Sequence, residues 1–459
     1  MGTSSCSPNR ARAKILWYTR GIGRFPLRVP KHLRYDARLI HRSEGSPVSE
    51  SPSRRSFLQT SAAVGAASIL LPSIRAANAD EKLNVGLIGC GNRGRSLIRE
   101  VLKLKHNVVA ICDIAEFRLS DVAKIIALAD QKEKATEYAD FRKLLDHADL
   151  DAVVIATPDH HHRDMLIAAV DAGKDTYIEK PLSKSIEEGR EMIDAVRKSK
   201  RIVQVGNQRH SGPHWRRCRD VIESNDFGNL VLAKVWDTRN WVKKDPFAVP
   251  ATFTKEQAKQ VDWAAFLGKA PKREFNAVRY WAWRWYWDYA GGLMTDIGAH
   301  QLDVVQWLGG VDAPKSVMAH GGRYHFKHWE TPDVLQGTWD YGTFAATFSV
   351  QFINGADGVG AAFYGTKQTL IADADKEIRL YNTSDKITPD TEPKEVWKVE
   401  PETPLHVKNW LECCNSRKEP NSPIELGHRV IVAAHLANLS YRTGKRVYWD
   451  ADRQEVIGG

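Results

Sequence analysis

The sequence predicts an α/β fold in which a parallel, doubly wound sheet is followed by a strand-rich second half. Three observations support this prediction. A short apolar strand from Val85 to Ile88 leads into a glycine-rich turn and then a helical pattern through Leu97 and Val101. Buried strands then alternate with helical stretches as far as residue 205. Beyond residue 230, strand-like runs are separated by turn residues rather than by long helices.

The composition is that of an ordinary globular protein. The chain has 459 residues, of which 42% are hydrophobic and 27% charged, so it is long enough for two or three domains. These values exclude a disordered, collagenous or disulfide-stapled chain. The cysteines after residue 79 are Cys90, Cys112, Cys218, Cys413 and Cys414. Their odd number and irregular spacing predict neither a disulfide framework nor a zinc site.

The formal net charge of +10 comes from the first 79 residues. These hold 13 of the 66 Lys and Arg residues but only 3 of the 56 Asp and Glu residues, so 53 of each remain in the rest of the chain. A surface that binds phosphate backbones needs a cationic excess, which this balanced part lacks. The sequence therefore predicts no nucleic-acid partner.

Residues 1–79 have the features of a removable leader. Ser53-Arg54-Arg55-Ser56-Phe57-Leu58-Gln59 precedes an apolar stretch over 60–71, and Ala77-Asn78-Ala79 is a small-residue cleavage site. In this order the features resemble a twin-arginine export signal. About a dozen apolar residues cannot cross a ~30 Å hydrocarbon core, so stable membrane insertion is not expected unless the signal stays uncleaved. We expect export to the periplasm or beyond by the twin-arginine machinery, with cleavage near Ala79.

The turn after the first strand reads Gly89-Cys90-Gly91-Asn92-Arg93-Gly94. In a dinucleotide site, three such glycines serve a tight turn, the close approach of backbone to pyrophosphate, and the packing of helix on strand. The next buried strand, 108–112, ends in Asp113, 24 residues after Gly89. A carboxylate there accepts hydrogen bonds from a ribose 2'-hydroxyl. This order of features predicts dinucleotide binding rather than an ordinary turn.

Asp113 also bears on which dinucleotide binds. A carboxylate about 4 Å from a 2'-phosphate is repelled by roughly 4 kcal/mol per unit charge at an effective dielectric near 20. NAD is therefore predicted over NADP. Arg118 is close enough in sequence to weaken this discrimination if its side chain turns inward.

The later strands of the wound unit end in polar motifs. Strand 151–156 leads into Thr157-Pro158-Asp159-His160-His161-His162, strand 176–178 into Glu179-Lys180-Pro181, and strand 202–205 into Gly206-Asn207-Gln208-Arg209. Ligands bind beyond the carboxyl ends of such strands, so these loops and Asp113 are expected to converge on one crevice. Three consecutive histidines cannot all point at one ion, so contacts to cofactor or substrate are predicted in place of a metal. A helix is expected over 163–172.

A further motif, Gly291-Gly292-x-x-x-Asp296-x-x-x-His300, lies in the second half. Together with Gly89-x-Gly91-x-x-Gly94, Thr157-Pro158-Asp159-His160-x-His162 and Glu179-Lys180-Pro181, it resembles the glucose-fructose oxidoreductase and inositol dehydrogenase family (Gfo/Idh/MocA) over about 82–455. The resemblance implies a Rossmann NAD-binding domain followed by an α+β domain with a large open antiparallel sheet. In the family that sheet carries the substrate face and often joins subunits, so a homo-oligomer is expected.

The predicted domain organisation follows from these motifs. It comprises a leader (1–79), a Rossmann domain (80–205), a substrate-binding α+β domain (206–405) and a C-terminal helical segment (406–459). Strands of the second domain are expected at 230–237, 316–320, 334–341, 343–352 and 359–371. A helical pattern at 427–442 is expected to return to the first domain.

The stretch 293–308 is amphipathic and places Asp296, His300 and Asp303 at i, i+4 and i+7, on one helix face. Oxidation of a carbinol requires that its hydroxyl proton be removed, and a histidine base contributes about 10² to 10⁴ in rate. The resemblance implies that His300 acts on the reacting hydroxyl, that Asp296 hydrogen-bonds nearby, and that Lys180 supports substrate and proton transfer. A solvated lysine and a structural Asp–His pair are the alternatives.

The window 280–289 has seven aromatic residues in ten positions. Flat aromatic faces suit the apolar sides of sugar rings, while Arg284 and Asp288 could bond hydroxyl groups. Alternate members of the window could instead pack inward as core. Weaker candidates from neighbouring loops are Asn240, Trp241, His325, His328 and Trp329.

The predicted site residues fall into three groups. The catalytic residues are Lys180, Asp296 and His300. The cofactor contacts are Gly89, Gly91, Asn92, Arg93, Gly94, Asp113, Thr157, Pro158, His160, His162, Glu179 and Lys180. The substrate contacts are Gln208, Arg209, Trp283, Arg284, Trp285, Asp296 and His300.

Export constrains the reaction, because no soluble NAD pool is expected outside the cytoplasm. The sequence therefore predicts an NAD-dependent oxidoreductase that holds its cofactor tightly and acts on the CH–OH group of a sugar, glycoside or polyol. One alternative is a redox-assisted glycosidase, which resembles the NAD-dependent α-N-acetylgalactosaminidases and returns the hydride within one cycle. Another is a non-catalytic, NAD-bound sugar-binding protein, which would need no proton acceptor beside the nicotinamide.

Overall fold

The computed structural model describes residues 81–458 apart from 130, 132, 374 and 375. The predicted leader, with its Arg54-Arg55 pair, its apolar stretch over 60–71 and its cleavage site at Ala79, lies outside the described residues. Among the residues described, no helix combines the length and the apolar character needed to cross a membrane.

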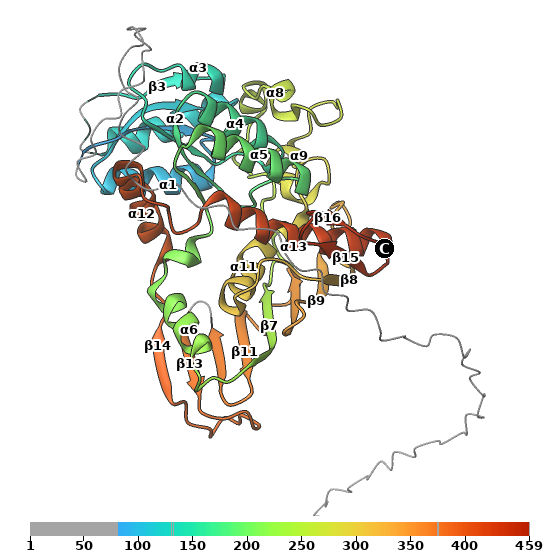
Figure 1. Cartoon of the computed structure of the whole chain (residues 1–459). Coiled ribbons are helices and arrows are strands. Elements are labelled where there is room, and N and C mark those ends of the chain that lie inside the picture. Colours follow the sequence, from blue (N-terminus) through green and yellow to red (C-terminus); the bar gives the residue numbers. More distant parts are fainter. Residues whose placement is uncertain (1–80, 130, 132, 374–375, 459) are drawn as a thin grey trace, which may run out of the picture. The chain divides into compact units, whose positions relative to one another are not determined.

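A six-stranded parallel sheet forms the first half of the described chain (Figure 1). Its strands are β1 (Asn84–Ile88), β2 (Asn107–Cys112), β3 (Thr136–Tyr138), β4 (Ala152–Ile155), β5 (Asp175–Ile178) and β6 (Val203–Val205). Their order in the sheet is β3-β2-β1-β4-β5-β6. The direction of winding reverses between β1 and β4, and such a switch point opens a ligand crevice at the carboxyl ends of the strands.

Helices cover this sheet and explain its uninterrupted apolar strands. The connections are α1 (Asn92–Lys103), α2 (Glu116–Ala127), α3 (Phe141–Leu145), α4 (His162–Asp171) and α5 (Ile186–Ser199), and α12 (Glu402–Ser416) returns to pack against α1. In α1, Leu97, Ile98 and Val101 are fully buried at helical spacing, as the sequence pattern predicts. The helix expected over 163–172 is confirmed as α4.

The second half forms a ten-stranded sheet that is mixed rather than wholly antiparallel. Its strands are β7 (Leu230–Thr238), β8 (Ser316–Gly322), β9 (Val334–Asp340), β10 (Ala345–Gln351), β11 (Val359–Gly365), β12 (Thr369–Asp373), β13 (Glu377–Tyr381), β14 (Glu395–Lys398), β15 (Val447–Asp450) and β16 (Glu455–Val456). The prediction of an antiparallel sheet is corrected at its centre, where β7 and β10 are parallel because a long connection separates them. The run predicted at 359–371 is two strands, since the chain turns over 366–368, where Gly365 N donates to Gln368 O.

Three helices pack on the large sheet and link it to the crevice: α10 (Gly292–Asp296), α11 (Gly298–Gly309) and α13 (Ile424–Thr443). α13 contacts β8 and α11 on one side, and α5 and β6 of the first sheet on the other. In Figure 1 this long red helix runs between the two sheets. α13, from the C-terminal part of the chain, therefore packs between the two halves of the described chain.

The stretch predicted as one helix over 293–308 is divided. α10 ends at Asp296 and α11 begins at Gly298. In an uninterrupted helix, the carbonyl of Asp296 would accept a hydrogen bond from the N–H of His300. Here that carbonyl accepts from Nζ of Lys180 at 2.7 Å, and the N–H of His300 donates to Ile297 O at 3.0 Å. Lys180, which follows β5, thus binds at the break, and Asp296 and His300 lie on either side of a single interrupting residue, Ile297, whose backbone stays in the right-handed helical region.

Candidate active site

A cavity of about 460 Å³ lies beyond the carboxyl ends of the first sheet and reaches α11. Its walls include the predicted residues Gly89, Gly91, Asn92, Arg93, Asp113, Thr157, Pro158, Glu179, Lys180, Gln208, Trp283, Arg284, Asp296 and His300. Residues from both halves of the chain therefore meet at the switch point of the first sheet, as the convergence of loops predicts.

The glycine turn has the geometry that a pyrophosphate requires. Gly89 has a φ of +96°, a conformation that favours glycine. A Cβ on Gly94 would lie 2.0 Å from the carbonyl oxygen of Gly89, so only glycine allows α1 to pack this closely. A Cβ on Gly91 would meet no atom within 4 Å, which leaves room above the N-terminus of α1 for a phosphate group.

One segment of the second half crosses to the first sheet, and we call residues 253–285 the strap. It contains α7 (Lys255–Lys259), α8 (Trp263–Leu267) and α9 (Ala277–Trp281). Val261 forms a β-bridge with Ala115, just after β2. The carbonyl of Phe266 accepts a hydrogen bond from Nε2 of His160 at 2.7 Å. The strap is thereby tied to the loops that follow β2 and β4, across one end of the cavity.

Asp113 lines this end of the cavity together with Arg118 and Trp281. The carboxylate of Asp113 accepts hydrogen bonds from the N–H groups of Cys90 at 2.7 Å and Ala115 at 3.0 Å. Burial raises the pKa of Asp113 to about 6, against the effect of these hydrogen bonds and of Arg118. The guanidinium of Arg118 lies 4.3 Å from the ring centroid of Trp281, so Arg118 does turn inward. A carboxylate and a cation therefore line the same end of the cavity.

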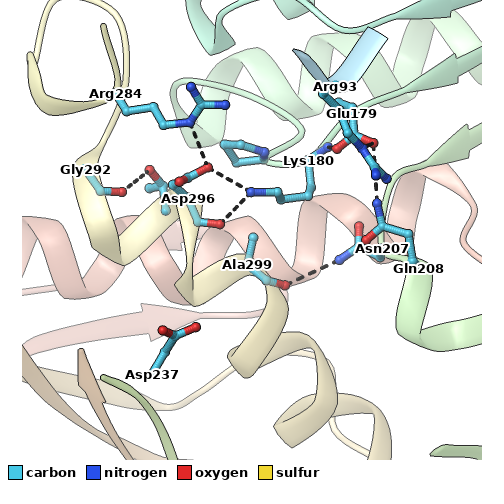
Figure 2. A network of polar contacts seen from close by, with 12 residues as sticks. Arg93, Glu179, Lys180, Asn207, Gln208, Asp237, Arg284, Gly292, Asp296 and Ala299 are labelled. Atoms are coloured by element: carbon cyan, nitrogen blue, oxygen red, sulfur yellow. Dashed lines mark hydrogen bonds and ion pairs between the residues drawn. The ribbon is translucent and has the colours of Figure 1, made fainter. Parts of the chain in front are cut away.

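Lys180, Asp296 and Arg284 form a buried charged cluster at the other end (Figure 2). Nζ of Lys180 lies 2.8 Å from Oδ1 of Asp296, and Nε of Arg284 lies 3.4 Å from the same oxygen. The side chains of Lys180 and Asp296 are only 13% and 9% exposed. Although burial alone would raise the pKa of Asp296, Lys180 and Arg284 hold it well below its usual range. The carboxylate thus stays ionised and fixes the lysine ammonium in the cavity.

His300 presents its imidazole to the same end of the cavity. Burial, and then the positive charges of Lys180 and Arg209, lower the pKa of His300 well below its usual range. The ring is therefore neutral at pH 7 and able to accept a proton. Among the described residues, no hydrogen bond engages its ring nitrogens, which leaves them available to a ligand.

A second cluster of polar side chains, Arg93, Glu179 and Gln208, lines the cavity between its two ends. Nε of Arg93 donates to Oε1 of Glu179 at 2.7 Å, and Nε2 of Gln208 lies 3.4 Å from the same oxygen (Figure 2). A Cβ on Gly206 would lie 2.8 Å from this oxygen, so the carboxylate is packed tightly under the chain. Glu179, which follows β5, thus connects the glycine turn with the 207–209 loop.

Two of the predicted histidine contacts lie behind the cavity wall and do not line it. His162 is fully buried, with Nδ1 2.9 Å from Pro181 O and Nε2 3.0 Å from Thr157 O. His160 bonds to the strap, as described above, whereas His161 lines the cavity. The rings of His160 and His162 therefore join loops and do not line the cavity in which the sequence predicts them. The described residues contain no group of three or more His, Cys, Asp or Glu side chains that could hold a metal ion.

Two further predictions, the substrate contacts of Trp285 and Arg209, are corrected by packing. Trp285 is fully buried and stacks on Trp329 with ring centroids 4.0 Å apart. Arg209 does not line the cavity and instead donates to the carbonyl of His300 at 2.9 Å. Gly94 does not line the cavity but allows α1 to pack closely, which is the packing role that the glycine spacing predicts. Asp303, on the predicted helix face, pairs with buried His210 at 2.6 Å and also lies away from the cavity.

Sequence reasoning missed several residues of the cavity wall. Arg239, Phe247 and Phe141 line it, although no motif marked them. Phe247 has a φ of +62°, a strained conformation for a bulky residue. Asp159, inside the Thr-Pro-Asp-His motif, is 2% exposed, and burial followed by the charge of Asp296 raises its pKa to about 8. The motif predicts histidine contacts, but it is the carboxyl group of Asp159 that interacts electrostatically with Asp296, Arg284 and Lys180.

A parallel sheet with a glycine turn and an acid after β2, which share one cavity with an imidazole from the second half, is the arrangement of a dinucleotide-binding fold. The chain belongs to the Gfo/Idh/MocA family. Residues 83–207 match the family model described as an oxidoreductase family NAD-binding Rossmann fold, and residues 236–459 match its C-terminal alpha/beta domain. Residues 51–70 match the twin-arginine translocation signal sequence. The family, fold class and export signal predicted from the sequence are confirmed.

Curated relatives include inositol dehydrogenases. The inositol 2-dehydrogenase of Pseudomonas fluorescens is 36% identical over 153 residues, which is 33% of this chain and 44% of that protein. The scyllo-inositol 2-dehydrogenase (NAD(+)) of Bacillus subtilis is 26% identical over 246 residues, 53% of this chain and 58% of that protein. The chain thus spans about half the length of these relatives.

Solved structures share the fold. The WlbA dehydrogenase of Bordetella pertussis, in complex with NADH and UDP-GlcNAcA, has a TM-score of 0.60 at 19% identity and covers 81% of this chain and 100% of that one. A levoglucosan dehydrogenase in complex with NADH and levoglucosan has a TM-score of 0.63 at 17% identity, covering 80% and 99%. At identities below 20% this likeness shows that the fold is shared and shows nothing about the substrate.

Proposed function

We propose that the protein is an NAD-dependent oxidoreductase that acts on the CH–OH group of a sugar, glycoside or polyol and keeps its cofactor bound. The observation that supports this most strongly is that neutral His300, the Lys180–Asp296 pair and the glycine turn open into one cavity. A structural Asp–His pair would not leave an unbonded imidazole and a fixed ammonium facing the same space.

The residues present fit NAD. The open space at Gly91 and the N-terminus of α1 suit its pyrophosphate, and Asp113 suits a ribose 2'-hydroxyl. Asp113 would repel a 2'-phosphate, and this repulsion is the reason for the proposed preference for NAD over NADP. Arg118 offsets part of the repulsion and so reduces the preference. When bound, NAD supplies the two-electron acceptor for the substrate carbon.

The side chains at the other end divide the remaining work. His300 accepts the proton of the reacting hydroxyl, because its lowered pKa keeps the ring neutral. The ammonium of Lys180 donates a hydrogen bond to the substrate oxygen and stabilises negative charge that develops there. Asp296 positions Lys180 through both its carboxylate and its carbonyl oxygen.

The strap supports a tightly held cofactor. It closes the Asp113 end of the cavity through the Ala115–Val261 bridge and the Phe266 carbonyl, and stacks Trp281 on Arg118. Retention suits an exported enzyme, for which we propose a periplasmic location, cleavage near Ala79, a carbohydrate substrate and a homo-oligomeric state.

A redox-assisted glycosidase is the second candidate, because an enclosed cofactor also suits a cycle that returns its electrons. Purified holoprotein would be mixed with sugars, polyols and nitrophenyl glycosides while absorbance is followed at 340 nm. Lasting absorbance or a keto product is the result expected for the oxidoreductase. Release of free sugar without lasting absorbance would favour the glycosidase. Bound NAD that no member of the panel reduces, with no glycoside cleaved, would contradict both candidates.

A further inference from the structure

The guanidinium of Arg284 packs against two aromatic rings at the His300 end of the cavity. Its carbon atom lies 4.2 Å from the ring centroid of Trp283 and 4.3 Å from that of Phe247. Its Nε is anchored on Asp296 at 3.4 Å, and the side chain is 22% exposed. Figure 2 shows this side chain reaching Asp296 from the side opposite Lys180.

This arrangement leaves the two terminal nitrogens of the Arg284 guanidinium available to donate hydrogen bonds to a ligand. Within the described part of the chain, no hydrogen bond or ion pair engages the two terminal nitrogens of Arg284, which lines the cavity. Nε of Arg284 is buried beside Asp296 and makes no hydrogen bond among the described residues, so the terminal nitrogens present the N–H groups of the planar guanidinium that match a carboxylate. Phe247 packs on it while in a left-handed conformation, and backbone strain of this kind is typical of ligand-binding sites.

The charges at this end do not balance. The cations are Lys180, Arg239 and Arg284, whereas the carboxylates paired with them are Asp296 and Asp237. Two cations share Asp296. Asp159, the remaining buried carboxyl group here, is mostly protonated at pH 7 because burial raises its pKa to about 8. An excess positive charge of about one unit in a largely buried cavity favours an anionic ligand.

We propose that the substrate is an acidic sugar, a hexuronic acid or its glycoside, whose carboxylate is bound by the terminal nitrogens of Arg284. The inference rests on the proposed function and names its substrate class. Because Arg284 and Lys180 contact the same oxygen of Asp296, a carboxylate on Arg284 would lie beside the ammonium and hence close to the reacting carbon.

The first test compares matched ligands on the purified holoprotein. D-glucuronate and D-galacturonate, with D-glucose and D-galactose as neutral parents, would be titrated by calorimetry while bound NAD is monitored at 340 nm. We expect at least one uronate to bind ten times more tightly than its parent, with an affinity that falls as salt is added. Binding of no uronate in preference to its parent would overturn the inference. Preferential uronate binding without reduction of NAD would support it while contradicting the proposed oxidation.

The second test uses variants. Arg284→Gln should weaken uronate binding about 10- to 100-fold and weaken binding of the neutral parent much less, and Arg284→Lys should retain part of the uronate affinity. The matched control is Arg219→Gln, which removes an arginine that pairs with Glu223 away from the cavity wall and the strap and should change neither affinity. Equal losses for uronate and neutral sugar in Arg284→Gln would show a structural role and refute carboxylate recognition. If that variant does not fold, the salt dependence of uronate binding to the parent protein decides.

Discussion

Replacing Asp296 by Asn should weaken both the fold and the reaction. The carboxylate is largely buried and pairs with Lys180 at 2.8 Å and Arg284 at 3.4 Å. Breaking a buried ion pair by removing one partner typically costs about 3–5 kcal/mol. Because Asn keeps an oxygen that can accept from Lys180, we expect the lower end, about 3 kcal/mol of unfolding free energy.

Thermal unfolding followed by circular dichroism measures this loss. With an unfolding entropy of about 2.1 cal/mol/K per residue, a folded unit of roughly 380 residues should lose about 4 °C in its midpoint. The pKa of Asp296 is lowered in the folded state, so its stabilising contribution is complete above the unfolded pKa near 4 and is lost as pH falls through the folded value. The difference between the wild-type protein and the variant should therefore be full at pH 7 and shrink below pH 4.

A matched control separates stability from catalysis. Asp303→Asn disturbs another buried acid, paired with His210 at 2.6 Å, that does not line the cavity. Both variants should lose stability, but only Asp296→Asn should slow reduction of bound NAD, by about 10². Our account of Lys180 positioning would be refuted if Asp296→Asn kept the midpoint and the rate of the wild-type protein.

Three further predictions concern the base, the glycine turn and the strap. Because the pKa of His300 is lowered, the rate of NAD reduction should stay high as pH falls from 7 to about 5, and a half-maximal rate near pH 6.5 would contradict this; a pH profile of single-turnover absorbance measures it. Gly91→Ala should abolish NAD binding yet keep the unfolding midpoint, whereas Gly94→Ala should lower the midpoint as well, since its Cβ would lie 2.0 Å from a carbonyl oxygen; equal midpoints for the two would be inconsistent with the packing. Trp281→Ala should release NAD during gel filtration while the wild-type protein retains it, as measured from the absorbance of the protein peak, and full retention by the variant would remove the strap from cofactor binding.

The first sheet was predictable because its signals are local. The strand before Gly89, the buried spacing of Leu97, Ile98 and Val101, and the acid at 113 all lie within one short stretch of chain, and each has one physical reason to be there. The convergence of Lys180 with the later motif followed from the general rule that ligands bind at the carboxyl ends of parallel strands.

The errors arose where distant parts of the chain decide the outcome. The periodicity of 293–308 is that of one helix, but Lys180, more than a hundred residues earlier, takes the carbonyl that would have continued it. The Thr-Pro-Asp-His motif predicts His162 as a cofactor contact, but both nitrogens of its ring bond to backbone carbonyl groups of two loops. The parallel β7–β10 pair depends on which strands become neighbours, and an alternating pattern is the same in either direction.

Replacement of His300 by Ala tests the central claim most directly. The variant and the wild-type protein would be purified, their bound NAD quantified, and a single turnover with the active sugar followed at 340 nm. We predict an unchanged NAD content and a rate at least 10²-fold lower than that of the wild-type protein. A variant that reduces its bound NAD at the rate of the wild-type protein would contradict the assignment of His300 as the base.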